Sequence, residues 1–454
     1  MLRKNQVFAF SLIALVASGC ATQRPTREAD SSSLTSGVDP QSLRPPVQTN
    51  QTTLSATGVV SLSKALALAL ARSPELATYS FDIRIAEAEI LQAGLRPNPE
   101  FQIESENIAG SGPYTGIKGA EHTLQLGQLI ELAGKRQKRV EEARLGRRVV
   151  QLEYEARKRE VFLATHAAFI QTLVGQRAVA VNEELVTLAE QVLPDIQRRI
   201  DAGRTSPLEA QRANVAVANT RIALEQARRE LLSAKHRLAA QWGETQPNFS
   251  SVEGNLEEIT NIGTLEALYG RLATNPLLTR LAAELAQREA RLRLEKARSV
   301  PDLTVFGGVR EFGRGDDAAM VVGASIPLPF FNKNQGAIAA ARERVARTDA
   351  ERSAAQTRLS AEMAEAFHLA EGALTQAKLF RETVLPESER ALATAREGYN
   401  AGRFSFLDLL DAQRTLVAAR QQYLQALSTY HQANARLSSL VTDVNQPQQA
   451  PSTR

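Results

Sequence analysis

The chain of 454 residues is written twice, and this repetition constrains its fold more than any other feature. The sequence LARSPEL, at 70–76, recurs 202 residues later as LATNPLL, at 272–278. Further along, AGRTSPL at 202–208 recurs 199 residues later as AGRFSFL. Because both matches keep the same order, they predict two structural units of one design. We place these units at 61–245 and 263–443, joined by a polar linker at 246–262.

Each unit has the same predicted order of elements: a helix, two strands and two long helices. Apolar residues at helical spacing begin each unit, and a Pro-containing stop separates that helix from an alternating segment. The last long helix of the second unit has apolar residues every three or four positions, as in a coiled-coil seam. That seam comprises Leu409, Ala412, Leu416, Ala419, Tyr423, Ala426, Tyr430, Ala433 and Leu437.

The alternating segments have the pattern of strands with one polar and one apolar face. Gln102, Glu104 and Glu106 fall on one side, and Phe101 and Ile103 on the other. Strands of about ten residues with this pattern suit a water-filled barrel in a membrane, with the polar residues facing the lumen. The alternative is an ordinary soluble hairpin. Four strands cannot close a barrel, so a barrel needs several copies: two give eight strands and three give twelve.

The N-terminus has the features of a bacterial export signal. Arg3 and Lys4 precede a short apolar run that ends in small residues, so 1–19 is predicted to be a signal peptide. The sole cysteine, Cys20, follows a sequence that resembles a lipobox, and we predict that it carries lipid; the alternative is an incidental cysteine. Inner-membrane lipoproteins of many Gram-negative bacteria resemble one another in having Asp after this cysteine. This chain has Ala21 there, which favours the outer membrane. Residues 20–60 are predicted to be a tether, and 444–454 a disordered tail.

Composition and motifs narrow the function classes. The formal net charge is only +4, which argues against a nucleic-acid partner. No catalytic motif occurs, and none of the five histidines pairs with another at metal-ligand spacing on one helix. His166 and His368, counterparts in the repeat, are interpreted as ordinary helix positions. No apolar run reaches the length of a transmembrane helix. We therefore predict a protein that is not an enzyme and holds no cofactor or structural metal.

These features together resemble the TolC-type outer membrane efflux channels, over about residues 60–443. Three further segments resemble one branch, the outer membrane component of cobalt-zinc-cadmium cation efflux systems. They are AGLRPNPE at 93–100, ELAGKR at 131–136 and IPLPFFNKNQG at 326–336.

The resemblance implies a mainly α-helical fold with a β-barrel part. A homotrimer would share a 12-stranded barrel in the lipid of the outer membrane, continued by a long periplasmic α-helical barrel. It also implies two partners, a periplasmic adaptor protein and an inner-membrane, proton-driven pump of the RND type. The implied function is the exit duct of this pump for heavy-metal cations. The alternatives are a drug-efflux or type I secretion duct of the same fold, and a periplasmic coiled-coil scaffold lipoprotein without a pore.

The resemblance also assigns roles to the two AGR turns. Their residues would form the periplasmic tips that dock on the adaptor, although plain turn chemistry explains them equally well. The tip residues are Gly203, Arg204, Ser206, Leu208, Gly402, Arg403, Ser405 and Leu407. Asp408 and Asp411 follow the second turn on one helix face and match an acidic pair that would act as a periplasmic gate. The alternative for this pair is a solvated capping turn. The first unit has Glu209 and Arg212 there instead.

Overall fold

The computed structural model describes residues 56–441, apart from residue 118 and the short segments 260–261 and 314–316. These residues lie in one compact unit. The predicted signal peptide, Cys20 and the 444–454 tail fall outside the described residues.

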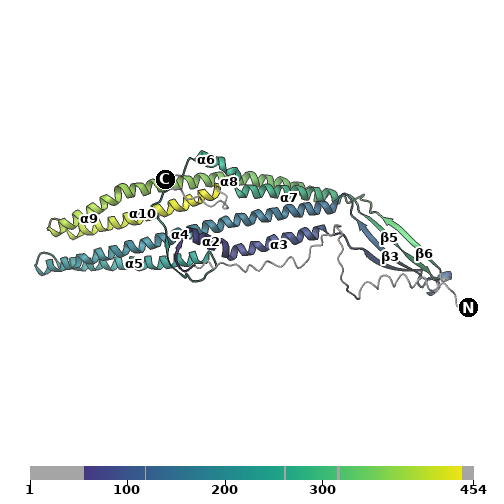
Figure 1. Cartoon of the computed structure of the whole chain (residues 1–454), viewed down its shortest axis with the longest axis horizontal. Coiled ribbons are helices and arrows are strands. Elements are labelled where there is room, and N and C mark those ends of the chain that lie inside the picture. Colours follow the sequence, from purple (N-terminus) through teal and green to yellow (C-terminus); the bar gives the residue numbers. More distant parts are fainter. Residues whose placement is uncertain (1–55, 118, 260–261, 314–316, 442–454) are drawn as a thin grey trace, which may run out of the picture. The chain divides into compact units, whose positions relative to one another are not determined.

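The elements of both units follow the predicted order with two differences: two helices rather than one precede the strands of each unit, and the first long helix of the second unit is divided into α8 and α9 (Figure 1). The elements of the first unit are α2 (Leu62–Arg72), α3 (Pro74–Gly94), β2 (Glu100–Glu106), β3 (Glu121–Ile130), α4 (Lys135–Asp201) and α5 (Pro207–Ala240). Those of the second are α6 (Leu265–Arg271), α7 (Pro276–Arg298), β5 (Leu303–Phe312), β6 (Asp317–Ser325), α8 (Gln335–Leu379), α9 (Leu385–Asn400) and α10 (Phe406–Val441). Pro74 and Pro276 each occupy the first position of a helix, where the missing N–H has no intrahelical partner to lose.

Two short strands lie where no strand was predicted. β1 (Gly58–Ser61) belongs to the predicted tether, and β4 (Phe249–Glu253) to the predicted linker. They pair in parallel, and Val60 and Val252 are buried in a core that also holds Trp242. The segment joining the two repeats is therefore anchored by pairing with a segment about 190 residues away. Such pairing leaves no periodic pattern in strands of four or five residues.

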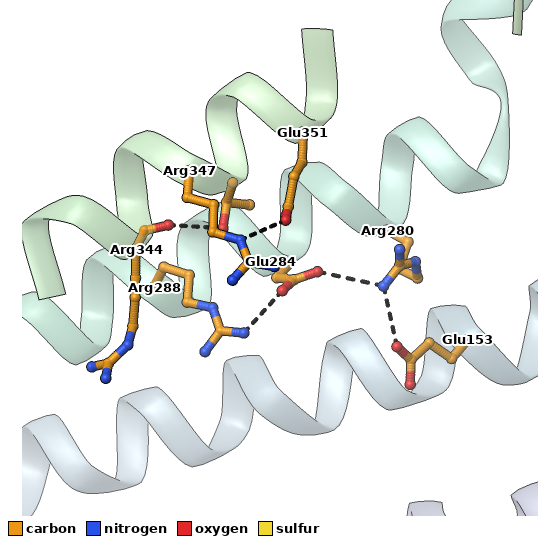
Figure 2. Close-up of polar contacts among 8 residues, drawn as sticks. Glu153, Arg280, Glu284, Arg288, Arg344, Arg347 and Glu351 are labelled. Atoms are coloured by element: carbon orange, nitrogen blue, oxygen red, sulfur yellow. Dashed lines mark hydrogen bonds and ion pairs between the residues drawn. The ribbon is translucent and has the colours of Figure 1, made fainter. Parts of the chain in front are cut away.

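The long helices pack side by side in a layer. Near the sheet the order is α3, α4, α7 and α8; further from it, α5, α4 and α10 are neighbours, and α10 also packs on α8 and α9 (Figure 1). Ion pairs join the layer: Arg147 of α4 donates to Glu87 of α3, and Arg280 of α7 contacts Glu153 of α4 at 3.2 Å (Figure 2). Among the helices that the structure describes, none is both long and apolar enough to cross a membrane.

The repeat extends to individual ion pairs between the helices. Arg221 of α5 donates to Glu190 of α4 with its Nη2 atom, 2.6 Å away. The counterparts 199 residues later, Arg420 of α10 and Glu389 of α9, form the same pair at 3.2 Å. Arg420 in addition contacts Glu184 of α4 at 2.7 Å, so this arginine joins the two units.

The long helices differ in how they accommodate proline. α4 is continuous across Pro194, whereas the corresponding helix of the second unit passes through a π-helical turn, Phe380–Val384, just before Pro386. A π-helical turn inserts an extra residue, and helices commonly change direction at such turns. The seam predicted in the last helix is buried along α10, with Ala412 half-buried.

The four strands of the larger sheet are antiparallel, in the order β2-β3-β5-β6. Gln102 lies opposite Gln125, and Glu104 opposite Thr123, which lies opposite Arg310. This polar face is matched on the other side by an apolar face with highly exposed side chains. The apolar face includes Phe101, Ile103, Leu124, Leu126, Val309, Met320 and Val322.

Polar side chains fix the junctions between strands and helices. The Arg139 guanidinium pairs with Glu131 and donates to the carbonyls of Ala93 and Leu95, so it caps the end of α3. On the second unit, Asn334, with a left-handed φ of 60°, donates at 2.8 Å to both the carbonyl and the carboxylate of Glu295.

Two adjacent glycines in β5 provide a test of the sheet. A Cβ atom at Gly308 would lie 2.1 Å from the carbonyl oxygen of Leu124, whereas one at Gly307 would lie 3.8 Å from that of Val321. We predict that Gly308→Ala destabilises the sheet by about 1–3 kcal/mol, because backbone must move, and that Gly307→Ala is tolerated. The heat-dependent migration of each variant on gels would measure this loss of stability. Equal behaviour of the two variants would contradict the register.

His166 of α4 predicts how the stability of the fold depends on pH. Its Nδ1 atom is buried and has no hydrogen-bond partner among the described residues. Burial, reinforced by nearby His431, lowers the pKa of His166 to about 4. The unfolded chain therefore takes up the proton first. Stability should fall as pH drops from about 6.5 to 4, by up to about 3 kcal/mol.

In His166→Phe this contribution should vanish, so unfolding should depend less on pH. The fluorescence of Trp242, the only tryptophan, reports unfolding of the adjoining core. The matched control is His368→Phe, the repeat counterpart, whose side chain is 67% exposed. Unfolding midpoints that keep the wild-type pH dependence in His166→Phe would refute the assignment.

Candidate functional site: the paired hairpin tips

The first tip is the turn between α4 and α5. Gly203 has a φ of 69°, and the N–H of Arg204 donates to the carbonyl of Arg199 at 2.8 Å, closing the end of α4. Ser206 then begins α5, since its Oγ accepts from the N–H of Leu208 at 3.3 Å. Glycine is required for the positive φ and serine for the cap, so both residues have a structural role here.

The second tip repeats this turn with a stronger cap. Gly402 has a φ of 74°, and the N–H of Arg403 donates to the carbonyl of Gly398 at 2.8 Å. Ser405 and Asp408 form a reciprocal capping box: the Asp408 carboxylate accepts from the N–H and the hydroxyl of Ser405, both at 2.8 Å. The Asp408 side chain therefore has a capping role, which the sequence analysis gave as the alternative to a gate.

The predicted acidic pair differs in how its two members are held. Hydrogen bonds from Ser405 lower the pKa of Asp408, so this group stays ionised at mildly acidic pH. Asp411 lies one turn further along α10 and is exposed; among the described residues it makes no hydrogen bond or ion pair. Both carboxylates are on the surface of this chain, so a gate would require other copies to bring them together.

A set of contacts that the sequence did not reveal clamps the two tips together. Arg199, at the end of α4, donates to the carbonyls of Tyr399 and Asn400, the latter at 2.7 Å, and its guanidinium lies 4.2 Å from the centre of the Tyr399 ring. The Tyr399 hydroxyl donates to Glu209 of α5 at 3.3 Å. Burial and the neighbouring carboxylate raise the pKa of Tyr399. The residues are 190 or more apart in sequence, and no local motif signals them.

Large apolar side chains are exposed around both turns. Leu208 is 48% exposed and Leu407 55%. Phe404, which the sequence analysis did not single out, is 44% exposed, and its ring lies over Gly398, where a Cβ atom would be only 2.0 Å away. Leu407 and Phe404 thus form an apolar edge on the second tip.

The predicted lumen residues lie on one face of the sheet. The same face carries a positively charged side chain, Arg310, which was not predicted. Arg310 of β5 contacts Glu106 at 2.8 Å and Glu121 at 3.3 Å, and donates to Thr123 at 2.9 Å. Gln102 accepts from Gln125 at 2.9 Å. A lone arginine in a strand carries no spacing signal, which is why its partnership with the glutamates could not be read from the sequence.

No group of three or more His, Cys, Asp and Glu side chains in the described part of the chain is placed to hold a metal ion. Cys20, the predicted lipid site, lies outside that part.

Comparison with known proteins finds relatives that match most of this chain. The chain is 31% identical over 386 residues to the cobalt-zinc-cadmium resistance protein CzcC of Cupriavidus metallidurans, covering 85% of this chain and 91% of CzcC. It is 29% identical to the nickel and cobalt resistance protein CnrC of the same organism, over 68% of this chain and 71% of CnrC.

Solved structures share the fold at lower identity. CusC superposes with a TM-score of 0.70 at 17% identity, covering 85% of this chain and 93% of CusC. The Campylobacter jejuni CmeC outer membrane channel has a TM-score of 0.70 at 16% identity, over 84% of this chain and 85% of CmeC. The family model for outer membrane efflux proteins matches residues 65–244 and again 268–442, one match within each predicted unit. The chain therefore belongs to the outer membrane efflux protein family.

Proposed function

We propose that the chain is the exit duct of a tripartite RND-type pump that exports heavy-metal cations across the outer membrane. The proposed cargo rests on one observation, the similarity to CzcC, a cobalt-zinc-cadmium resistance protein, over nine tenths of the length of CzcC. Metal ions enter this proposal as cargo, which passes through the duct without a resident site.

The sheet supports a duct with a shared barrel. Its apolar face leaves Met320 and Val322 at least 80% exposed, and its polar face carries Arg310 with its glutamates. In lipid, apolar side chains on the outside and polar side chains inside require a closed barrel. We propose a homotrimer with a twelve-stranded barrel, anchored in addition by lipid on Cys20.

The tips support docking and gating at the other end. Exposed Leu208, Phe404 and Leu407 offer apolar side chains to a periplasmic adaptor, whose pump lies in the inner membrane. The acidic pair, repeated in three copies, would bring six carboxylates near the axis and favour cations there. The clamp of Arg199 and Tyr399 holds the two hairpins of each copy in one arrangement and would have to yield if the tips spread.

The gate predicts a change of ion selectivity. In Asp408→Asn plus Asp411→Asn, the amides keep the size of the side chains and remove the charge, so preference for cations should fall in single-channel recordings. The control is Glu230→Gln, which removes an exposed carboxylate of α5 away from the tips. Unchanged conductance and unchanged cation preference in the double variant would exclude a charge-based gate at these residues.

The cargo predicts a resistance phenotype. A strain without the protein should become sensitive to zinc, cobalt, cadmium or nickel salts, and the intact gene should restore tolerance, because export ends without an exit duct. A panel of drugs tested in parallel separates the alternatives. Sensitivity to drugs alone would retain the duct and refute metal export. The strain used must lack related ducts, since a substitute would mask the loss.

A further inference from the structure

The polar face of the four-stranded sheet has several acidic side chains and a single basic one. The basic residue is Arg310 of β5, which is the only Lys or Arg in the four strands as the structure describes them. The acidic residues on this face are Glu100, Glu104, Glu106, Glu121 and Asp317. Acidic side chains that line a pore attract cations. The position of the one arginine among them therefore bears on how a cation passes.

Arg310 lies beside two acidic residues that are directly opposite each other. Glu106 of β2 pairs with Glu121 of β3. The Cβ atoms of such partners lie about 4.5–5.5 Å apart, so their carboxylates repel each other. No other two acidic residues of the described strands are paired in this way. The arginine is thus located where two carboxylates meet.

All three nitrogens of the Arg310 guanidinium have a partner. Nη2 contacts Glu106 at 2.8 Å, Nη1 contacts Glu121 at 3.3 Å, and Nε donates to the hydroxyl of Thr123 at 2.9 Å. Thr123 is itself buried. Because these partners belong to β2 and β3, the side chain of Arg310 lies across three strands and is held there.

These residues lie at the end of the sheet that is remote from the helices (Figure 1). β2 begins at Glu100 after α3 and ends at Glu106, whereas β3 begins at Glu121 and ends at Ile130 before α4. In the proposed duct this end is the outer mouth of the barrel, the last part of the pore that a cation passes before release.

Two opposed carboxylates offer oxygen ligands of the kind that divalent cations take. A unit positive charge about 4 Å from a divalent ion weakens the binding of that ion by about thirtyfold, even in the dielectric constant of water. The guanidinium group keeps its proton in proteins, so its repulsion of cations does not depend on pH. A pore conducts only if each ion binds weakly enough to leave. Arg310 meets this condition at a point where the two acids alone would retain the ion.

We propose that Arg310 is a specificity-determining residue of the duct: it neutralises Glu106 and Glu121 and thereby prevents a divalent cation from binding between them. The inference rests on the proposed function, since it requires a barrel whose lumen is lined by the polar face. It deepens that function by assigning one residue to the release of the cargo at the outer mouth.

A purely structural role of Arg310 predicts something different. By relieving the repulsion between Glu106 and Glu121, the arginine also stabilises the sheet. Lysine keeps the charge but lacks the planar fork that joins several partners at once. A structural role alone therefore predicts a weaker sheet in both Arg310→Lys and Arg310→Gln, with no change in metal binding. Exclusion of cations predicts that only Arg310→Gln binds metal.

Block of a potassium current by metal ions tests the proposal. Channels of the purified protein in a planar lipid bilayer are recorded in potassium chloride while cobalt or zinc chloride is added. Every variant, and the parent, carries Asp408→Asn and Asp411→Asn, so that the acidic pair of the tips does not bind the metal. In Arg310→Gln, the metal concentration that halves the current should fall at least about tenfold, because the repelling charge is gone.

Two matched variants serve as controls. Arg310→Lys should retain the value of the parent, because the charge remains. Arg310→Gln combined with Glu106→Gln and Glu121→Gln should return to that value, because the carboxylates are removed. If Arg310→Gln alone forms no channels, Arg310→Gln with Glu106→Gln takes its place: it has no like-charge pair and keeps one carboxylate, so the metal should still block it at a lower concentration than the parent.

The outcomes separate this inference from the proposed function. Block that is stronger in Arg310→Gln and returns to the parent value in both controls would support the inference. Equal block in Arg310→Gln and the parent would overturn it and leave the duct standing. Stronger block that persists without Glu106 and Glu121 would overturn it as well, since the metal would then bind elsewhere. A parent that forms no channels in the bilayer would contradict the duct itself, and the inference with it.

Discussion

The unpaired edges of the four-stranded sheet are the constraint on which the rest of this structure depends. β2 and β6 each have one neighbouring strand among the described residues, and the sheet exposes an apolar face that water does not favour. An amphipathic sheet with two free edges is a fragment of a closed structure, since only closure satisfies the backbone and covers the apolar side in lipid. The helices next to the sheet are arranged in the same way. α3 lies at the edge where β2 ends the sheet, and α8 at the edge where β6 ends it. The proposed association of copies would complete both parts of the fold.

The chain passes four times between a helix and a strand of the larger sheet. Polar contacts join these junctions to one another. Lys135 at the start of α4 reaches Asp302, before β5, at 2.7 Å, and Asn334 before α8 reaches Glu295 at the end of α7. The segments that suggested a resemblance to cation efflux components, at 93–100, 131–136 and 326–336, contain these junction residues or lie beside them. Their polar side chains therefore hold the junctions between the sheet and the helices.

The sequence predicted what depends on local periodicity or on repetition. The order of elements, the two AGR turns and the buried seam of α10 follow from spacing, and the structure has all three. What could not be predicted depends on contacts between distant residues. β1 and β4 are too short for a pattern, and the contacts of Arg310 with Glu106 and Glu121 arise only from strand register. The Arg199–Tyr399 clamp joins residues 200 apart, each of which looks ordinary in its own helix.

The two tips have similar turns but different charged residues. Both turns retain the glycine and the serine cap, because each hairpin must reverse its direction. The charges differ: at the positions of Asp408 and Asp411 the first unit has Glu209 and Arg212. Glu209 is engaged by Tyr399, and Asp408 by Ser405, so both carboxylates stabilise local structure. Asp411 alone of these three acids has no partner within the described chain. In the proposed gate, Asp408 would therefore act as a fixed charge, whereas Asp411 could reorient toward a passing ion.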